Sequence, residues 1–261
     1  MDPEQLSLAP GVRAVALGRR LVQVGLEHTR AVRLTRTPAT ERLLTALATG
    51  ARLPDDPEAR AVAAELLDRG LAVPGMDSSV TRVAVVGRAG SDPVPLLESA
   101  GLACTTDADE ADVVLLAAEG ELDRELLVPL LRAQQPHLPV RLVDGVGLVG
   151  PFSVPGQSAC LGCVDLHRTA DDAAHLLLVD RYAHAAATAP APIGPDVVLG
   201  TLATAWAVRD LVTWSSGGCP STWSRTVRLE PGEGEVSAQA WWRHPECGCT
   251  WGQGPSATMG A

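Results

Sequence analysis

Four cysteines in two closely spaced pairs are the residues of this chain with the clearest chemistry. Cys160 and Cys163 form a Cys-x-x-Cys pair, and Cys247 and Cys249 form a Cys-x-Cys pair far downstream. Two thiolate pairs brought together by a fold make a tetrahedral site of soft ligands, which suits Zn²⁺ best. Because four protein ligands leave no open coordination position, such a zinc would hold structure and would not act as a Lewis acid.

Other readings of these residues stay open beside the structural zinc. A Cys-x-x-Cys pair alone could form a redox disulfide, but that motif expects a thioredoxin-like strand and helix, and here a loop over 154–157 leads in. His167 and His244 are close enough in sequence to replace a cysteine as ligand. Cys104 and Cys219 have no partner at short spacing, and we interpret them as structural thiols.

Composition bounds the class of protein. The chain has 261 residues, 46% of them hydrophobic and 20% charged, which is enough for one large domain or two small ones. We expect a cytoplasmic protein with no membrane partner, because no apolar run reaches about 18 residues and the N-terminus does not look like a signal peptide. A net charge of −10 disfavours nucleic acid as a partner. All 21 basic residues are arginine, which excludes a lysine Schiff base and a phosphate-binding lysine.

The N-terminal part, residues 1–76, is predicted to be a domain of its own. Alternating segments at 11–17 and 20–26, separated by Gly18-Arg19, indicate a hairpin, and 31–35 indicates a third strand. Two helices follow: Thr40 is expected to cap the first, which ends at Gly50, and the stretch 54–57 caps the second, which ends before Gly70. This pattern predicts a winged-helix-like module, which serves either as a packing domain or as a peptide clamp.

The second part, residues 77–252, is predicted to be an α/β domain of Rossmann type. Buried-strand patterns at 82–87, 112–116 and 140–143 alternate with helical patterns that end near Gly101 and span 122–134. This alternation is typical of a parallel sheet with right-handed crossovers. Residues 253–261 are small and polar, and we expect them to be a disordered tail.

The turn after the first strand of this domain is where a nucleotide would bind. A phosphate-binding loop needs Gly-x-Gly-x-x-Gly, so that backbone amides can approach the phosphates. Here the turn begins Gly87-Arg88-Ala89-Gly90, with Ala89 and Asp92 at the second and third glycine positions. Asp92 would repel a phosphate, so we interpret this segment as a strand-to-helix turn.

Several segments of the chain resemble a known family: 136–140, 149–156, 160–168 and 243–251. They are similar to the ThiF-like (ocin-ThiF-like) partner proteins of YcaO cyclodehydratases, which act in the biosynthesis of thiazole- and oxazole-modified ribosomal peptides, thiopeptides included. The N-terminal module is similar to the peptide clamp of that family, the RiPP recognition element. The resemblance implies that the clamp binds the leader of a precursor peptide while the partner YcaO enzyme uses ATP to cyclise residues of the core.

Related ubiquitin-activating-type enzymes adenylate a carboxylate themselves, and this chain departs from their pattern in its glycine turn, its lack of lysine and the absence of an Asp over 117–120. The resemblance therefore implies a non-catalytic leader-binding partner, and the alternative is a ThiF-type ATP-dependent adenylating enzyme. The sequence does not decide the oligomeric state, a homodimer being one option. We expect the leader to add as a strand along the third strand and to contact the second helix, through Ala31, Val32, Arg33, Leu34, Thr35, Ala61, Ala64, Glu65 and Asp68.

Overall fold

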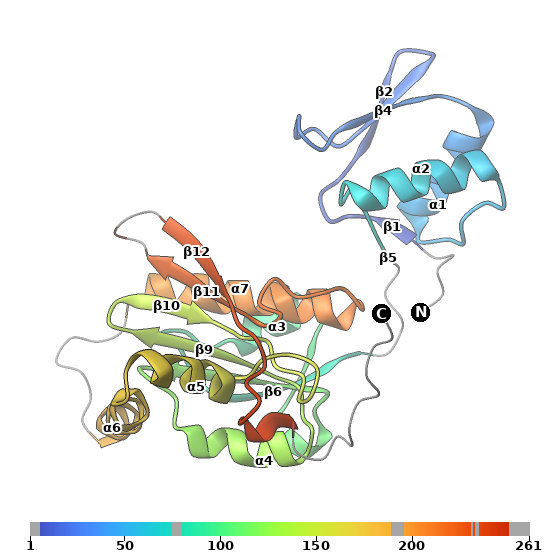
Figure 1. The fold of residues 1–261 in the computed structure, drawn as a ribbon. Helices are drawn as coiled ribbons and strands as arrows, with labels where there is room; N and C mark the ends of the chain where they lie inside the picture. The colour runs from blue at the N-terminus through green and yellow to red at the C-terminus, as the bar shows by residue number, and fades with distance from the viewer. Residues whose placement is uncertain (1–5, 75–79, 189–195, 231, 233–234, 251–261) are drawn as a thin grey trace. The chain divides into compact units, whose positions relative to one another are not determined.

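The computed structural model describes residues 6–74, 80–188, 196–230, 232 and 235–250. The chain separates into two compact units, Met1–Ser78 and Ser79–Ala261, and each is described by itself (Figure 1). The tail predicted over 253–261 lies outside the described residues. Among the helices of the described ranges, none is long and apolar enough to cross a membrane.

The smaller unit combines a three-stranded antiparallel sheet with two helices and a short strand pair. The sheet has the order β2-β3-β4, which makes β2 and β4 its two edge strands. A separate antiparallel pair joins the first and last strands of the unit. The elements are β1 (Leu6–Leu8), β2 (Ala14–Leu17), β3 (Leu21–Val24), β4 (Val32–Thr35), α1 (Pro38–Thr49), α2 (Pro57–Asp68) and β5 (Ala72–Pro74).

Alternating side chains of the sheet build the core of this unit. Strand β4 alternates between buried and exposed positions, as a half-buried strand does. Its Val32 and Leu34 face the same way as Val22 and Val24 of β3, and all four lie in one apolar cluster with residues of α1 and α2 such as Leu43.

The caps of both helices are visible. Asp56 caps α2 by accepting bonds from the backbone N–H groups of Glu58 and Ala59, as the sequence predicted. The prediction that Thr40 caps α1 is wrong. Pro38 occupies the first turn, so the cap falls on Thr37, whose hydroxyl oxygen accepts a 3.1 Å bond from the N–H of Thr40.

The larger unit is built on one seven-stranded mixed sheet with the order β12-β11-β10-β9-β8-β6-β7. Strands β7, β6, β8 and β9 are parallel, as the alternation of strands and helices predicted, whereas β9 to β12 are antiparallel. The strands are β6 (Arg82–Gly87), β7 (Ala103–Thr105), β8 (Val113–Glu119), β9 (His137–Val143), β10 (Val146–Val149), β11 (Arg225–Glu230) and β12 (Glu235–Ala240).

Helices cover both faces of this sheet (Figure 1). Residues of α3 and α7 join one apolar cluster with Val113, Leu115 and Ala117 of β8, and residues of α4 and α5 join another with Val114 and Leu116. The predicted helix over 122–134 is shorter, because the chain first makes a 3₁₀ turn. The helical elements are α3 (Val94–Ser99), η1 (Ala108–Glu110), η2 (Arg124–Leu126), α4 (Leu127–Arg132), α5 (Leu161–Asp171), α6 (His175–Thr188), α7 (Val197–Ser215) and η3 (Gly248–Thr250).

Candidate functional site

The two cysteine pairs meet at the start of helix α5. Cys160 is the N-cap residue of α5 and Cys163 lies in its first turn. After β12 the chain returns to this point, where Cys247 and then Cys249, in the short turn η3, approach the first pair. The fold therefore brings together residues that are far apart in the sequence. Cys160 and Cys247 are separated by 87 positions.

The geometry of the four sulfur atoms fits a tetrahedral metal site. The Sγ of Cys160 lies 3.8 Å from that of Cys163 and 3.6 Å from that of Cys247, and Cys163 lies 3.5 Å from Cys249. All four sulfur atoms are within 4.8 Å of one another. A ZnS₄ tetrahedron with bonds of about 2.3 Å has edges of about 3.8 Å, and a disulfide needs about 2.05 Å. The buried cluster can hold a metal ion, and the cysteines in it are not paired as disulfides.

Close packing around the cluster restricts the size of the side chains beside the sulfur atoms. An added Cβ on Gly162 would lie only 3.2 Å from the sulfur of Cys247, so glycine leaves room for the second pair. The thiols also perturb one another. Hydrogen bonds with Cys163 and Cys247 raise the pKa of Cys160, whereas the bond from Cys160 lowers the pKa of Cys163.

Aromatic and basic side chains cover one side of the cluster. Trp241 is buried in the same apolar cluster as the cysteines, with the guanidinium of Arg168 5.6 Å from its ring centre. His167 lies beside Trp241 and His244, and its Nε2 is 2.9 Å from the backbone oxygen of Trp242. These contacts place His167 against Trp241, which shares the apolar cluster of the cysteines, and His244 against His167. The side chain of Trp242 itself is 74% exposed.

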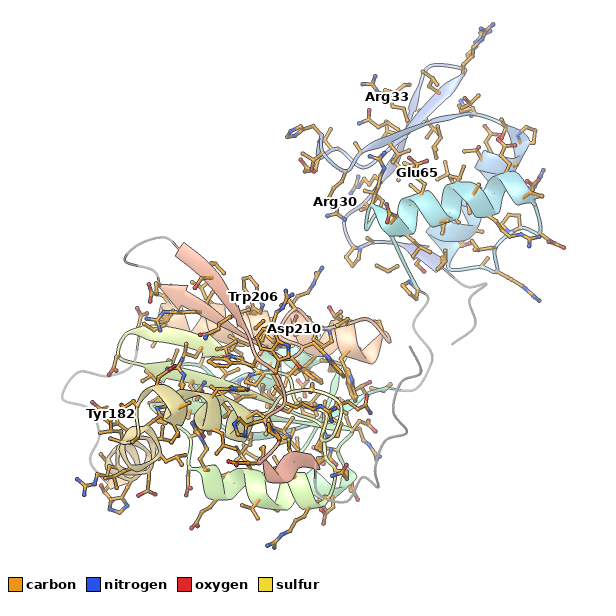
Figure 2. The ribbon with its side chains drawn as sticks, in the orientation of Figure 1. Arg30, Arg33, Glu65, Tyr182, Trp206 and Asp210 are labelled. Atoms are coloured by element: carbon orange, nitrogen blue, oxygen red, sulfur yellow. The ribbon has the colours of Figure 1, made fainter. Side chains whose placement is uncertain are left out.

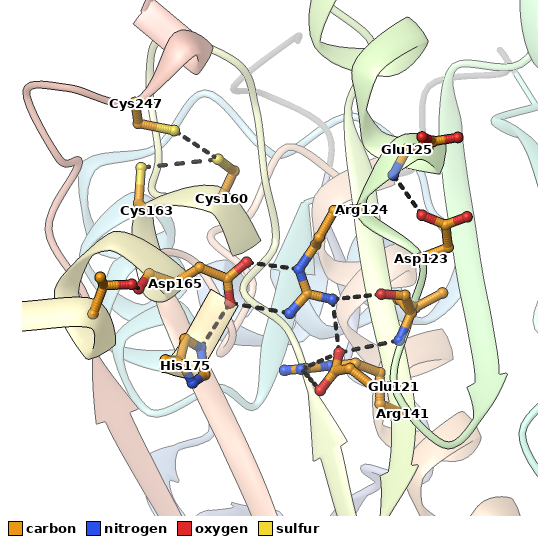
Figure 3. Close-up of polar contacts among 12 residues, drawn as sticks. Glu121, Asp123, Arg124, Glu125, Arg141, Cys160, Cys163, Asp165, His175 and Cys247 are labelled. Carbon is orange, nitrogen blue, oxygen red and sulfur yellow. Dashed lines mark hydrogen bonds and ion pairs between the residues drawn. The ribbon is translucent and has the colours of Figure 1, made fainter. Parts of the chain in front are cut away.

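A buried ionic network begins two residues after Cys163 (Figure 3). Asp165 accepts two bonds from the guanidinium of Arg124, at 2.7 and 3.0 Å, and its Oδ1 lies 3.1 Å from Nε2 of His175. Arg124 also donates a 2.7 Å bond to Glu121, which receives bonds of 2.8 and 2.9 Å from Arg141 of β9. The network ties the cysteine-bearing helix α5 to the loop after β8 and to the sheet.

Burial makes the charges of this network strongly interdependent. Burial raises the pKa of Glu121, but the charges of Arg141 and Arg124 outweigh it and lower the pKa to about 2. Burial lowers the pKa of Arg141. Local sequence patterns do not predict this network. Its available signal was the single arginine, Arg141, inside the apolar run of β9.

The turn after β6 is closed by the protein's own groups. Gly87 has φ +77°, and an added Cβ would lie 2.2 Å from the backbone oxygen of Ala117 on β8. A Cβ on Gly200 of α7 would lie 2.3 Å from the oxygen of Ala89, which is fully buried. Backbone packing against β8 and α7 therefore accounts for glycine at Gly87 and for the tight contact of this turn with α7.

Carboxylates occupy the amide donors of this turn. The Oε1 of Glu119, at the end of β8, accepts a 3.4 Å bond from the N–H of Gly90 and lies 3.4 Å from Arg88. Asp92 accepts a 3.0 Å bond from the N–H of Val94, the first residue of α3. Where a phosphate would need free amides, the chain presents two negative charges. The contribution of Asp92 was predicted from the sequence, and that of Glu119 was not.

The residues predicted to contact a peptide divide into two groups. On β4, Val32 and Leu34 are buried in the core, Arg33 and Thr35 are exposed, and Ala31 just before the strand is half-buried. The predicted residues of α2 are all exposed: Ala61, Ala64, Glu65 and Asp68.

Solved structures show which fold this is. The heterocyclase TruD matches with a TM-score of 0.62 and 18% identity over 94% of this chain, and the match covers 42% of the TruD chain. MccB of E. coli matches with a TM-score of 0.54 and 13% identity, over 98% of this chain and 99% of MccB. The fold is that of MccB and of the matching part of TruD.

These likenesses confirm the resemblance noted in the sequence at the level of the fold. A heterocyclase solved with substrate and cofactor also matches, with a TM-score of 0.59 and 16% identity, over 94% of this chain and 39% of its own length. The chain thus spans about two fifths of the heterocyclases that it matches. No protein-family model and no curated protein sequence matches the chain.

Proposed function

We propose that this protein is a non-catalytic, zinc-stabilised partner of a YcaO cyclodehydratase that binds the leader of a precursor peptide in thiazole/oxazole peptide biosynthesis. The observation that carries the proposal is the open edge of β4, which runs beside helix α2. The smaller unit would act as the winged-helix peptide clamp, and the larger unit would be its zinc-bearing ThiF-like support in the cytoplasm.

Within the described residues, the hydrogen-bond pattern of the sheet leaves β4 open on one side. The N–H of Arg36 donates a 2.9 Å bond to the oxygen of Arg20 on the β3 side. Because antiparallel pairs alternate, the main chain of Leu34 and Val32 also faces β3, and that of Arg33 and Thr35 faces away. A peptide strand could pair with those outward groups.

Contacts at both ends of β4 align it with α2. Before the strand, Arg30 donates a 2.9 Å bond to the backbone oxygen of Arg69, just after α2. After the strand, the hydroxyl of Thr37 donates a 2.9 Å bond to Glu58, in the first turn of α2. The helix thus lies along the open edge, with Glu65 on it (Figure 2). Its exposed Ala61 and Glu65 would meet the side chains of a bound strand.

Charge supports a leader with acidic residues. Arg30, Arg33 and Arg36 stand along β4 and are exposed. Acidic residues of a leader on the outward side of β4 would meet Arg33. Glu65 and Asp68, on α2, would instead favour apolar or basic side chains on the opposite side of the same peptide.

Zinc is the ion that best suits the cysteine cluster. Four buried thiol groups with sulfur separations close to those of a ZnS₄ tetrahedron are the donors that zinc prefers. Cys160, Cys163, Cys247 and Cys249 would hold the ion, which would cross-link α5 to the C-terminal segment. With no open coordination position, its role is structural.

The closed glycine turn supports a protein that does not adenylate its substrate. Glu119 and Asp92 put negative charge on the amides that a triphosphate would need, and the chain has no lysine to offset it. The alternative remains a ThiF-type ATP-dependent adenylating enzyme, since a structure of E. coli MccB with ATP shares the fold at a TM-score of 0.53. In this proposal, the cyclisation activity that the chain serves belongs to its YcaO partner.

Fluorescent leader peptides, taken from open reading frames beside the gene, test the proposal by anisotropy. We expect one leader to bind, Arg33→Pro to abolish binding because it removes an outward N–H, and Arg33→Ala to weaken binding and flatten its salt dependence. Circular dichroism must show that the Pro variant is folded. Wild-type affinity in a folded Arg33→Pro variant would place the leader elsewhere.

A second assay separates the two functions. Purified protein with precursor peptide is assayed for ATP–pyrophosphate exchange, and we expect none. Robust exchange would favour the adenylating enzyme.

A further inference from the structure

The face of the small sheet that points away from α1 and α2 carries exposed aliphatic side chains. By the strand register, Val15 of β2 lies beside Gln23, and Leu17 beside Leu21, on the side opposite the buried valines of β3. Val15 is 56% exposed and Leu17 is 44% exposed. Neighbouring aliphatic groups exposed on one small sheet are typical of an interaction surface.

A hollow adjoins these side chains. It has a volume of about 570 Å³, and its apolar walls come from Val12, Val15, Leu17, Leu26 and Leu71. Leu26, at its rim, is 90% exposed. The hollow is large enough to take one or two apolar side chains of a binding partner.

In the part of the chain that the structure describes, strand β2 also has an open edge, on the other side of the sheet from β4. The N–H of Gly25 donates a 3.0 Å bond to the oxygen of Arg13, so the main chain of Val15 and Leu17 faces β3 by alternation. The main chain of Ala14 and Ala16 therefore faces away from β3. Their side chains are small and do not obstruct an added strand.

The charge around this hairpin has the opposite sign to that of the whole chain. Residues 10–36 contain six arginines and one glutamate, a balance of 6 − 1 = +5, in a chain of net charge −10. Arg13, Arg19 and Arg20 are exposed and make no ion pair within the described residues. The one carboxylate, Glu27, lines the hollow and is held by bonds from Thr29, which lower its pKa. Glu27 therefore disfavours an acidic group inside the hollow, whereas Arg13 and Arg19, before and after β2, attract acidic groups at the two ends of that strand.

We propose that the β2 edge and its outward face are a docking surface for an acidic segment of a partner protein, which adds as a strand beside β2. Two apolar side chains at alternate positions cover Val15 and Leu17 and enter the hollow. An acidic residue at each end of the segment meets Arg13 at one side and Arg19 at the other. This surface goes beyond the leader site, and since β3 lies between the two edge strands, both edges can be occupied at once.

A labelled seven-residue peptide, Glu-Thr-Leu-Thr-Leu-Thr-Glu, is the probe for this surface. We expect it to bind the full-length protein, with an affinity that falls as salt rises. Two control peptides, one with Lys in place of both Glu and one with Ser in place of both Leu, should bind at least tenfold more weakly. Absence of binding by the Glu peptide at millimolar protein would overturn the proposal.

Variants place the peptide on the surface. Leu17→Glu should lower the affinity for the Glu peptide at least tenfold. Arg13→Glu should lower it by the same factor and should raise the affinity for the Lys peptide. An unfolded variant could not give this rescue by charge reversal. The matched control is Ala48→Glu, an exposed position on α1, on the opposite side of the sheet, which should leave the affinity unchanged. The proposal fails if Leu17→Glu binds normally, if only Arg33→Pro abolishes binding, or if an unlabelled leader peptide displaces the probe.

Discussion

Loss of one cysteine from the cluster should remove the metal and a long-range cross-link together. In Cys247→Ser the remaining ligands no longer close the loop between residues 160 and 247, which are 87 positions apart. The chain-entropy relation for a cross-link over that length gives about 4.6 kcal/mol at 25 °C. A domain is stable by about 5–15 kcal/mol, so this loss removes a large part of the stability of the larger unit. For a unit of this size, it corresponds to a fall in Tm of about 10–20 °C.

The assay combines elemental analysis with thermal unfolding. Wild-type protein should contain one zinc per chain, and Cys160→Ser and Cys247→Ser should contain none and melt at the lower temperature. A chelator should bring the wild-type protein to the same Tm. Cys219→Ser is the matched control, because this exposed cysteine lies outside the cluster. One zinc per chain in both cluster variants, or a Tm within about 3 °C of wild type, would refute the assignment.

Three further outcomes follow from the turn after β6 and from the buried ionic network. Calorimetry should detect no ATP binding by the wild-type protein, and Glu119→Ala alone should not create it, because the turn is still packed against Gly200; micromolar affinity in either protein would contradict this. Asp165→Asn should keep its zinc but lose about 3 kcal/mol of stability, because Arg124 would stay buried and lose its bidentate partner. Urea unfolding combined with zinc analysis checks this. Unchanged stability would count against the network. The pKa of Glu121 is lowered from 4.5 to about 2 in the folded protein, so its charge stabilises the fold by about 3 kcal/mol above pH 4.5, a contribution lost as the pH falls toward 2. The difference in unfolding free energy between wild type and Glu121→Gln should therefore shrink below about pH 4.5, and a constant difference from pH 7 to 3 would show that the charge is not responsible.

Sequence reasoning succeeded where chemistry or periodicity is local. Metal ligation requires short spacing within each cysteine pair, Cys160 with Cys163 and Cys247 with Cys249. The cluster could therefore be predicted without knowledge of the fold. Strand β4 alternates in the sequence as it does in the structure. Apart from Arg82 at the start of β6 and Glu119 at the end of β8, these two parallel strands are apolar, because helices cover both faces of the sheet.

What the sequence did not reveal depends on pairing between distant residues. Asp165 and Arg124 lie 41 positions apart, and nothing in either segment alone indicates that they meet. Glu119 lies at the end of strand β8, and its local sequence does not indicate a partner. Only the pairing of β8 with β6 brings its carboxylate to the N–H of Gly90. The antiparallel strands β10 and β11 are separated by 75 residues in the sequence, which hides their pairing.

The closed turn after β6 limits how this lineage could change. Glu119 is a side chain, and one substitution removes it, but the approach of Ala89 to Gly200 is between two backbones and has no side chain to remove. A descendant with a nucleotide site would need α7 to shift away from the turn, and α7 is packed into the main apolar cluster of the sheet. Point mutations that widen the turn would thus disturb the packing of α7 in the apolar cluster. The protein would lose stability before any gain in ligand binding could be selected. In evolutionary terms the closed turn is hard to reopen by single substitutions. Engineering an ATP site here would have to begin with the start of α7 rather than with the glycine motif.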